Sequence, residues 1–237
     1  MPIWIIIGVN RGLGLEFATQ LAVDASNTII AAIRSLSNCP ELEKLQSASK
    51  TFHILQCDTS SQDSITEFGK HVSKVIGPET KVDYLLNNAA INANSSLTSL
   101  TMNSEALTNH MNTNVMGPAK LVQVLTPHLQ EGSVVMNMTS GLASLAYNRS
   151  KEMPECTVYA MSKAALNMLT VHQAAHLKEK KVKVVCVDPG WVKTDMGGKS
   201  AVLEKEESIG RMLKVLKGLQ EGDSGKFFVY DGREMEW

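Results

Sequence analysis

Short apolar runs alternate with longer amphipathic stretches along the chain, and this alternation restricts the possible folds more than any other feature of the sequence. The apolar runs are rich in Ile, Val and Leu and contain few polar residues, which is typical of strands buried on both faces of a parallel sheet. We expect seven such strands, at residues 3–7, 28–33, 52–56, 82–87, 133–138, 182–187 and 227–230.

Helical patterns fill the segments between these strands. They cover roughly residues 12–23, 40–49, 61–75, 104–125, 157–178 and 204–219. A strict alternation of strand and helix predicts a parallel sheet with helices on both of its faces. A chain of 237 residues is long enough for one large core, and no internal repeat divides it. We therefore predict an α/β fold that forms a single domain over residues 1–237, with a doubly wound, seven-stranded parallel sheet of the Rossmann type.

Charge and cysteine content restrict the partners and the location. The formal net charge is −1 and no polybasic patch is present, so we expect no nucleic-acid partner. The four cysteines are too widely spaced for a redox pair or a metal site, which favours a reducing compartment. The opening run "MPIWIIIGV" is too short to span a bilayer and has no basic leader. We expect a cytoplasmic protein without a membrane anchor and without a metal site.

A glycine-rich turn, "GVNRGLG", joins the first predicted strand to the first predicted helix. Gly8, Gly12 and Gly14 allow a tight turn in which the backbone can approach a phosphate, and the helix N-terminus beyond it attracts negative charge. Asn10 and Leu13 lie inside the same turn. A purely structural turn is the alternative, but the strand–turn–helix context favours a dinucleotide site.

Two arginines indicate which dinucleotide binds. Arg11 lies in the glycine turn, and Arg34 ends the second strand, where a protein that prefers NAD is expected to carry an acid for the ribose 2′-hydroxyl. Guanidinium groups bind phosphate through paired, charge-assisted hydrogen bonds, so these positions suit a 2′-phosphate. Unless Arg34 is merely a surface residue at a strand end, the protein prefers NADPH to NADH.

The segment "YAMSK" places Tyr159 and Lys163 four residues apart, on one face of a predicted helix. An ammonium about 5 Å from a phenol, at an effective dielectric constant of about 20, favours the phenolate by roughly 3 kcal/mol. This corresponds to a fall of about two units in the pKa of the tyrosine, before desolvation raises the pKa again. We therefore expect Lys163 to tune Tyr159 as an acid; the alternative is a solvated lysine beside a half-buried tyrosine.

Several motifs follow one another in a fixed order. After the glycine turn come "NNAA" (87–90), "NTNVMGP" (112–118), "NMTSG" (137–141), "YAMSK" (159–163) and "DPGWVKTDMGG" (188–198). Together they resemble the short-chain dehydrogenase/reductase family, in its single-domain branch, over nearly the whole chain. The segment "PGWVKTDMGG" and the ending "FFVYDGREMEW" are most similar to the sniffer-type carbonyl reductases and the C-factor-like proteins.

The resemblance implies a catalytic group of Asn114, Ser140, Tyr159 and Lys163. In this family Tyr159 protonates the carbonyl oxygen, while the Ser140 hydroxyl donates to the same oxygen. Asn114 holds a water that relays protons to Lys163, which also binds the nicotinamide ribose. Taken alone, Ser140 would be a serine that ends a strand and Asn114 an asparagine on a helix surface.

The resemblance also implies that NADP(H) is the cofactor and places further residues around it. Asp58 meets the adenine ring, Asn88 and Ala89 line the cofactor beside the fourth strand, and Asn87 braces the sheet. The nicotinamide end is surrounded by Pro189, Gly190, Val192 and Thr194.

The chain departs from the family pattern at four points. Ile7 stands where the family has Thr, Ala90 replaces a glycine, and Asp188 replaces the common Asn before Pro-Gly. The fourth departure is the long polar segment between Ser140 and Tyr159. Residues 141–158 and 191–208 are expected to be loops that shape the substrate pocket, and we expect its lining to include Leu142, Tyr147, Trp191 and Met196.

The function that follows is NADPH-dependent transfer of hydride to a small-molecule carbonyl, in an aldehyde, ketone or quinone. An alternative is a non-catalytic regulator that binds NADPH, but such a protein should have lost Tyr159, Lys163 or Ser140, and all three are present. A sugar-nucleotide epimerase or dehydratase would need an added C-terminal substrate domain. The family builds its dimers from the helices equivalent to 104–125 and 157–178, so we expect a homodimer or a homotetramer.

Overall fold

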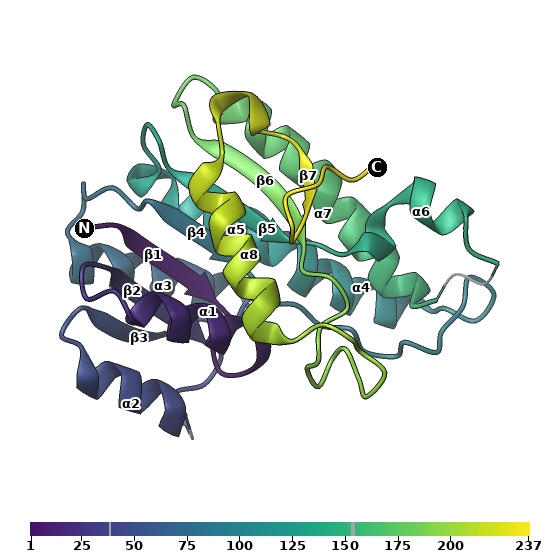
Figure 1. Cartoon of the computed structure of the whole chain (residues 1–237), viewed down its shortest axis with the longest axis horizontal. Helices are drawn as coiled ribbons and strands as arrows, with labels where there is room; N and C mark the ends of the chain where they lie inside the picture. Colours follow the sequence, from purple (N-terminus) through teal and green to yellow (C-terminus); the bar gives the residue numbers. More distant parts are fainter. Residues whose placement is uncertain (38, 153–154) are drawn as a thin grey trace.

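The computed structural model describes residues 1–37, 39–152 and 155–237. Its centre is a sheet of seven parallel strands in the order β3-β2-β1-β4-β5-β6-β7 (Figure 1). The strands are β1 (Ile3–Ile7), β2 (Thr28–Ile33), β3 (Phe52–Gln56), β4 (Tyr84–Asn87), β5 (Val134–Met138), β6 (Lys183–Asp188) and β7 (Phe227–Val229). The predicted fold class is confirmed. The strand order reverses between β1 and β4, which is where a doubly wound sheet opens a crevice for a ligand.

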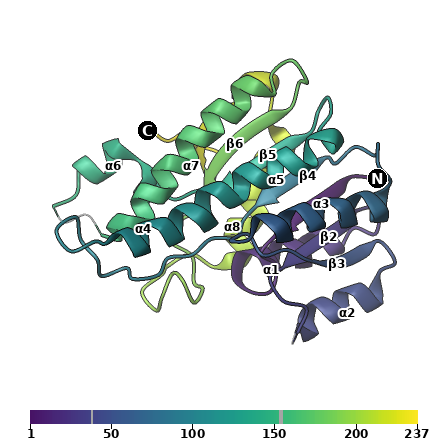
Figure 2. The same cartoon turned by 180° about the vertical axis from the view of Figure 1, so that it is seen from behind.

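Helices cover both faces of the sheet. Figure 1 shows α1, α2 and α8 in front of it, and Figure 2 shows α3, α4, α5 and α7 on the opposite face. The helices are α1 (Gly12–Ala22), α2 (Pro40–Ala48), α3 (Gln62–Ile76), α4 (Ser104–Met111), α5 (Gly117–Leu125), α6 (Leu145–Arg149), α7 (Thr157–His176) and α8 (Lys205–Gly218). Among the described residues, no helix is both long enough and apolar enough to span a membrane.

The strands are buried on both faces because successive side chains point to opposite sides of the sheet. Trp4 and Ile6 pack into the core that α1, α2 and α8 cover. Ile5 and Ile7 pack into the second core, beneath α3, α5 and α7. This two-sided burial explains why the strands are continuous apolar runs and not alternating ones.

The predicted helix over 104–125 is interrupted, and this detail of the prediction is wrong. Helix α4 passes into a π-helical turn, η1 (Asn112–Met116), before α5 begins at Gly117. In this turn Asn114 is buried, and its side chain bonds to the backbone of Ile91, in the segment after β4. The π-helical turn therefore coincides with the contact between Asn114 and Ile91. Such turns are frequent at functional sites.

The segment after β5 is also more ordered than expected. Residues 141–158 were expected to form a loop, but they include a 3₁₀ turn (Gly141–Ala143) and the short helix α6. Ser144 caps α6, because its hydroxyl oxygen accepts a hydrogen bond of 3.0 Å from the Tyr147 N–H. Residues 153 and 154 of this segment lie outside the described residues.

Helix α7 is joined to the sheet by buried hydrogen bonds. The Asn137 amide on β5 donates to Thr170 Oγ1 at 2.9 Å and to Gln173 Oε1 at 3.0 Å. The side-chain oxygen of Asn137 accepts a hydrogen bond of 2.8 Å from the Asn87 amide on β4. Asn87 therefore braces the sheet, as the sequence predicted, and α7 is held in a fixed register above β5.

Candidate active site

Two adjoining pockets open beyond the carboxyl ends of the strands. The first, here called the glycine-turn pocket, has a volume of about 320 Å³ and is lined by the glycine turn, Arg34, Asp58, Asn88 and Lys163 among others. The second, here called the outer pocket, has a volume of about 980 Å³ and contains Ser140, Leu142, Tyr147 and Trp191 in its wall. The residues that line both pockets are Leu13, Thr139, Tyr159, Pro189, Thr194 and Met196. Tyr159 thus lies where the two pockets meet.

The glycine turn packs so closely at Gly8 and Gly14 that neither position could hold a side chain. A Cβ atom on Gly14 would lie 2.0 Å from the Gly8 carbonyl oxygen, and one on Gly8 would lie 2.9 Å from the Ala89 Cα. The Asn88 amide fixes the turn by donating to the carbonyl oxygens of Ile7 and Gly8, at 3.1 and 3.0 Å. Within the described part of the chain, no side chain caps the start of α1. Its first N–H groups are therefore available to an anion, and this turn fits a dinucleotide pyrophosphate.

The far end of the glycine-turn pocket carries the residues expected around the adenosine half of a cofactor. Arg34 is exposed just after β2. Asp58 follows β3, and its carboxylate accepts hydrogen bonds from the Ser60 N–H at 2.9 Å and the Ser60 hydroxyl at 2.7 Å. Arg11 also lines this pocket, but it forms an ion pair with Asp195 at 2.9 Å.

Ser140 and Tyr159 meet at the floor of the outer pocket. Ser140 directly follows β5, and its hydroxyl oxygen accepts a hydrogen bond of 3.2 Å from the Leu142 N–H. Tyr159 lies in the first turn of α7. Burial raises the pKa of Tyr159 well above 10.0, the nearby Asp188 carboxylate raises it further, and a hydrogen bond with Ser140 lowers it in part. The phenol is therefore held in its protonated form at neutral pH.

Lys163 is fully buried behind the tyrosine. Its Nζ donates a hydrogen bond of 2.6 Å to the Met138 carbonyl oxygen and lies 5.7 Å from the centre of the Tyr159 ring. Burial lowers the pKa of Lys163 from 10.5 to about 7. Desolvation therefore outweighs the lowering of the Tyr159 pKa that was expected from Lys163, because burial disfavours the charged form of both groups.

Asn114 lies close to helix α7 but lines neither pocket. Its amide donates 3.0 Å hydrogen bonds to the Ile91 carbonyl and to the Ser162 hydroxyl, and its oxygen accepts from the Ile91 N–H at 2.9 Å. Ser162 lies between Tyr159 and Lys163 on α7. The side chain of Asn114 thus joins the segment after β4 to the helix that carries Tyr159 and Lys163.

The comparison with known proteins decides the family. The family model described as "short chain dehydrogenase" matches residues 2–204. The chain belongs to the short-chain dehydrogenase family. Among solved structures, an NADPH-bound carbonyl reductase from chicken fatty liver has a TM-score of 0.92 and 30% identity, over 100% of both chains. The carbonyl reductase Sniffer of D. melanogaster has a TM-score of 0.91 and 29% identity, over 100% of this chain and 99% of its own.

A curated relative supports the predicted subgroup as well. The C-signal protein of Myxococcus xanthus is 39% identical over 126 residues, which are 52% of this chain and 74% of that protein. The resemblance to the sniffer-type and C-factor-like members of the short-chain dehydrogenases is therefore confirmed.

The other residues expected to hold the cofactor lie in one of the two pockets. The glycine-turn pocket is lined by Gly8, Asn10, Arg11, Gly12, Leu13 and Gly14, and by Asn88, Ala89, Pro189 and Thr194. Gly190 and Val192, expected at the nicotinamide end, line the outer pocket, which adjoins it. The expected substrate residues Leu142, Tyr147, Trp191 and Met196 all line the outer pocket.

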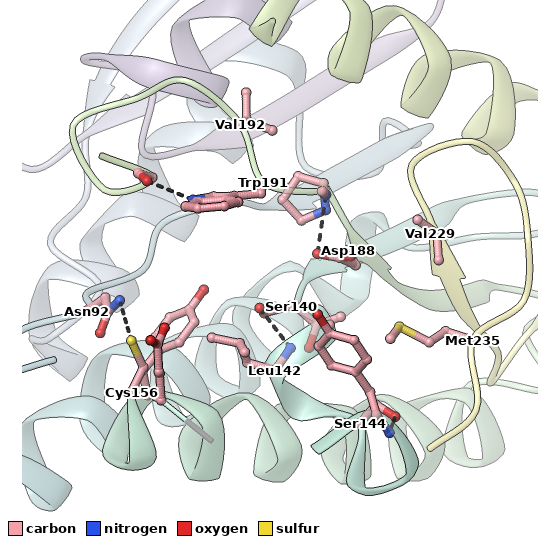
Figure 3. A pocket seen from close by; sticks show the side chains of 18 of the residues that line it. Asn92, Ser140, Leu142, Ser144, Cys156, Asp188, Trp191, Val192, Val229 and Met235 are labelled. Atoms are coloured by element: carbon pink, nitrogen blue, oxygen red, sulfur yellow. Dashed lines mark hydrogen bonds between the residues drawn. The ribbon is translucent and has the colours of Figure 1, made fainter. Parts of the chain in front are cut away.

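Sequence reasoning missed one wall of the outer pocket. Residues 233–236 form this wall, and Figure 3 shows Met235 beside Val229, on the opposite side of the pocket from Asn92 and Cys156. The chain returns there because the Met235 N–H donates to the Phe227 carbonyl at 2.7 Å. The signal for this reversal was the Asp-Gly pair at 231–232, since Gly232 has a φ of +93°.

The sequence also did not reveal that Asp188 lies in the wall of the outer pocket. It ends β6 and lines the outer pocket, and one carboxylate oxygen accepts a hydrogen bond of 3.2 Å from the Gly190 N–H. Burial raises the pKa of Asp188, and the N–H groups of Gly141 and Gly190 lower it in part. A carboxylate thus faces the same pocket as the phenol of Tyr159.

Burial of Lys163 makes the stability of the cofactor-free protein depend on pH. The folded-state pKa of about 7 lies below the ordinary value of 10.5, so the unfolded chain binds more protons between these values and stability rises with pH. From about pH 7 to about pH 9, this group should raise the free energy of unfolding by about 2 kcal/mol. Urea denaturation of the wild type and of Lys163→Met at both pH values measures this increase in the free energy of unfolding.

Comparison with the Lys163→Met variant also removes the contribution of other titratable groups to the pH dependence of stability. Cys57 and Cys186 have raised pKa values and lower the stability as they ionise in the unfolded chain, but both proteins contain them. The difference between the two proteins therefore isolates Lys163. Parallel pH profiles for the two proteins would show that the lysine is not buried as a neutral group.

Proposed function

We propose that this protein is an NADPH-dependent carbonyl reductase acting on an aldehyde, ketone or quinone. The observation that carries the proposal is the position of Tyr159, at the junction of a glycine-turn pocket and a larger outer pocket, with Ser140 on one side and Lys163 behind it. Similarity over the whole chain to an NADPH-bound carbonyl reductase from chicken supports it.

The residues of the glycine-turn pocket are suited to hold NADP(H). The open N-terminus of α1 would bind the pyrophosphate, Arg34 the 2′-phosphate, and Asp58 the adenine end. Thr194 and Pro189 line both pockets, so they would contact the nicotinamide end. Bound NADPH supplies the hydride that reduces the carbonyl carbon.

The proton required by the carbonyl oxygen comes from this chain. The raised pKa keeps the Tyr159 phenol protonated at neutral pH, so its O–H is available to the oxygen on which negative charge develops. The Ser140 hydroxyl, on the same pocket wall, would donate a second hydrogen bond to that oxygen. Lys163, with a pKa of about 7, can both hold and release a proton near neutral pH, and would restore the proton that Tyr159 gives up.

The proposal assigns the decisive proton to Tyr159. Tyr159→Phe should lower kcat for carbonyl reduction by at least about 100-fold, which is the usual contribution of a general acid. Binding of NADPH should change much less, since the ring is retained. The loss of reduced-nicotinamide absorbance with a panel of aldehydes, ketones and quinones measures turnover, and nicotinamide fluorescence measures binding.

Tyr84→Phe is the matched control, because Tyr84 lies on β4 and lines neither pocket, so turnover should stay near that of the wild type. Near-normal turnover by a well-folded Tyr159→Phe protein would refute the assignment. A wild type that binds NADPH tightly but reduces no carbonyl would favour the non-catalytic regulator.

The choice of cofactor is proposed to depend on Arg34. Replacing it by Asp places an acid where the 2′-phosphate would bind, so the ratio of kcat/KM for NADPH to that for NADH should fall by at least about tenfold. Arg149→Asp changes the net charge equally but lies outside both pockets, and should leave the ratio unchanged. An unaltered ratio in Arg34→Asp would exclude this role.

We further propose that the protein forms a homodimer, or a homotetramer assembled from dimers, through the face that includes α7. Met161, Met168 and Val171 on this helix are 44%, 62% and 41% exposed, which is unusual for apolar side chains on one helix. Light scattering after size-exclusion chromatography should give at least twice the mass of the monomer. The Met168→Lys variant should have a lower mass than the wild type. A monomeric wild type at micromolar concentration would contradict the proposal.

A cytoplasmic location remains a proposal as well. Cys39, Cys57, Cys156 and Cys186 are all free, which suits a reducing compartment.

A further inference from the structure

Arg11 is not free at the mouth of the glycine-turn pocket. Its Nη1 lies 2.9 Å from Asp195 Oδ2, although the two residues are 184 positions apart in the sequence. Both residues line the glycine-turn pocket. Arg34, in the same pocket, has no carboxylate within 4.0 Å in the part of the chain that the structure describes. Of the two cations predicted for a 2′-phosphate, one therefore already has an anionic partner.

We propose that Asp195 is a specificity-determining residue that competes with the 2′-phosphate of NADP(H) for the Arg11 guanidinium. This inference rests on the proposed function. A phosphate monoester carries more negative charge than a carboxylate, so it can displace Asp195 from the guanidinium, but the carboxylate then lies uncompensated beside it. NADH has no 2′-phosphate and does not require this exchange. Asp195 therefore lowers the affinity for NADPH and leaves that for NADH nearly unchanged.

The ion pair between Arg11 and Asp195 is exposed, and the turn that carries Asp195 does not depend on it. The ion pair is well exposed, with side-chain accessibilities of 72% and 78%, so its contribution is modest and sensitive to salt. The turn that carries Asp195 is held by other bonds: the Gly197 N–H donates to Thr194 Oγ1 at 3.1 Å, and the Trp191 indole donates to the Gly197 carbonyl at 2.8 Å. Neutralising Asp195 should therefore leave the turn in place.

The test is the affinity of Asp195→Asn for the two cofactors, without any substrate. Titration of nicotinamide fluorescence at low ionic strength should show an NADPH Kd about threefold to tenfold lower than that of the wild type, since one competing charge is lost. The NADH Kd should change less than about twofold, because only the 2′-phosphate competes with Asp195. The difference between the proteins should shrink at high salt, because the pair is exposed.

Glu204→Gln is the matched control. It also removes one carboxylate, from a residue that pairs with Lys193 and lines neither pocket. It should leave both Kd values within about twofold of the wild type, because its charge does not face Arg11.

Each remaining outcome overturns the inference. An unchanged or higher NADPH Kd in Asp195→Asn means that the carboxylate does not compete, and equal tightening of NADPH and NADH means that it acts on a shared part of the cofactors. Loss of NADPH preference in Arg34→Asp, with no change in Asp195→Asn, would support the proposed function and reject only this inference. A wild type that binds neither cofactor rejects both.

Discussion

Three successive residues of the sheet hold helix α7 in place, and the active site depends on this hold. The Asn137 amide donates hydrogen bonds to Thr170 and Gln173. The Met138 carbonyl oxygen accepts a hydrogen bond from Lys163 Nζ. The Thr139 hydroxyl donates a hydrogen bond of 2.6 Å to Asn167 Oδ1. These polar groups are buried, so leaving any of them without a partner would cost far more than the bond itself contributes. Ser140 is the next residue in the chain. The bonds that attach the helix to the sheet therefore also set Ser140 opposite Tyr159.

Burial governs the electrostatics of the same site. The pKa of Tyr159 and that of Asp188 are raised, while the pKa of Lys163 is lowered, and in all three the largest cause is removal from water. Each shift moves its group toward the neutral form. Burial thus weakens the tendency of all three side chains to carry charge, and the phenol of Tyr159 stays a hydrogen-bond donor at neutral pH.

Much of the fold could be predicted because buried parallel strands have an unmistakable composition. The predicted strand limits agree with the observed ones to within two residues, as for residues 82–87 and β4 (Tyr84–Asn87). The break in the helix after Met111 could not be foreseen, because it accompanies the contact between Asn114 and Ile91, two segments that only the fold brings together. The same is true of the ion pair between Arg11 and Asp195. The net direction of the Tyr159 shift could not be predicted, because the offset from Lys163 was known and the extent of burial was not.

The wall formed by residues 233–236 has a consequence for biosynthesis. Almost every other element of the two pockets precedes it in the chain, and β7 and this wall are added at the sheet edge after α8. Because chains fold from the N-terminus as they are made, a nascent chain could assemble the glycine-turn pocket while its outer pocket is still open on one side. The glycine-turn pocket can therefore form before the outer pocket has its final shape.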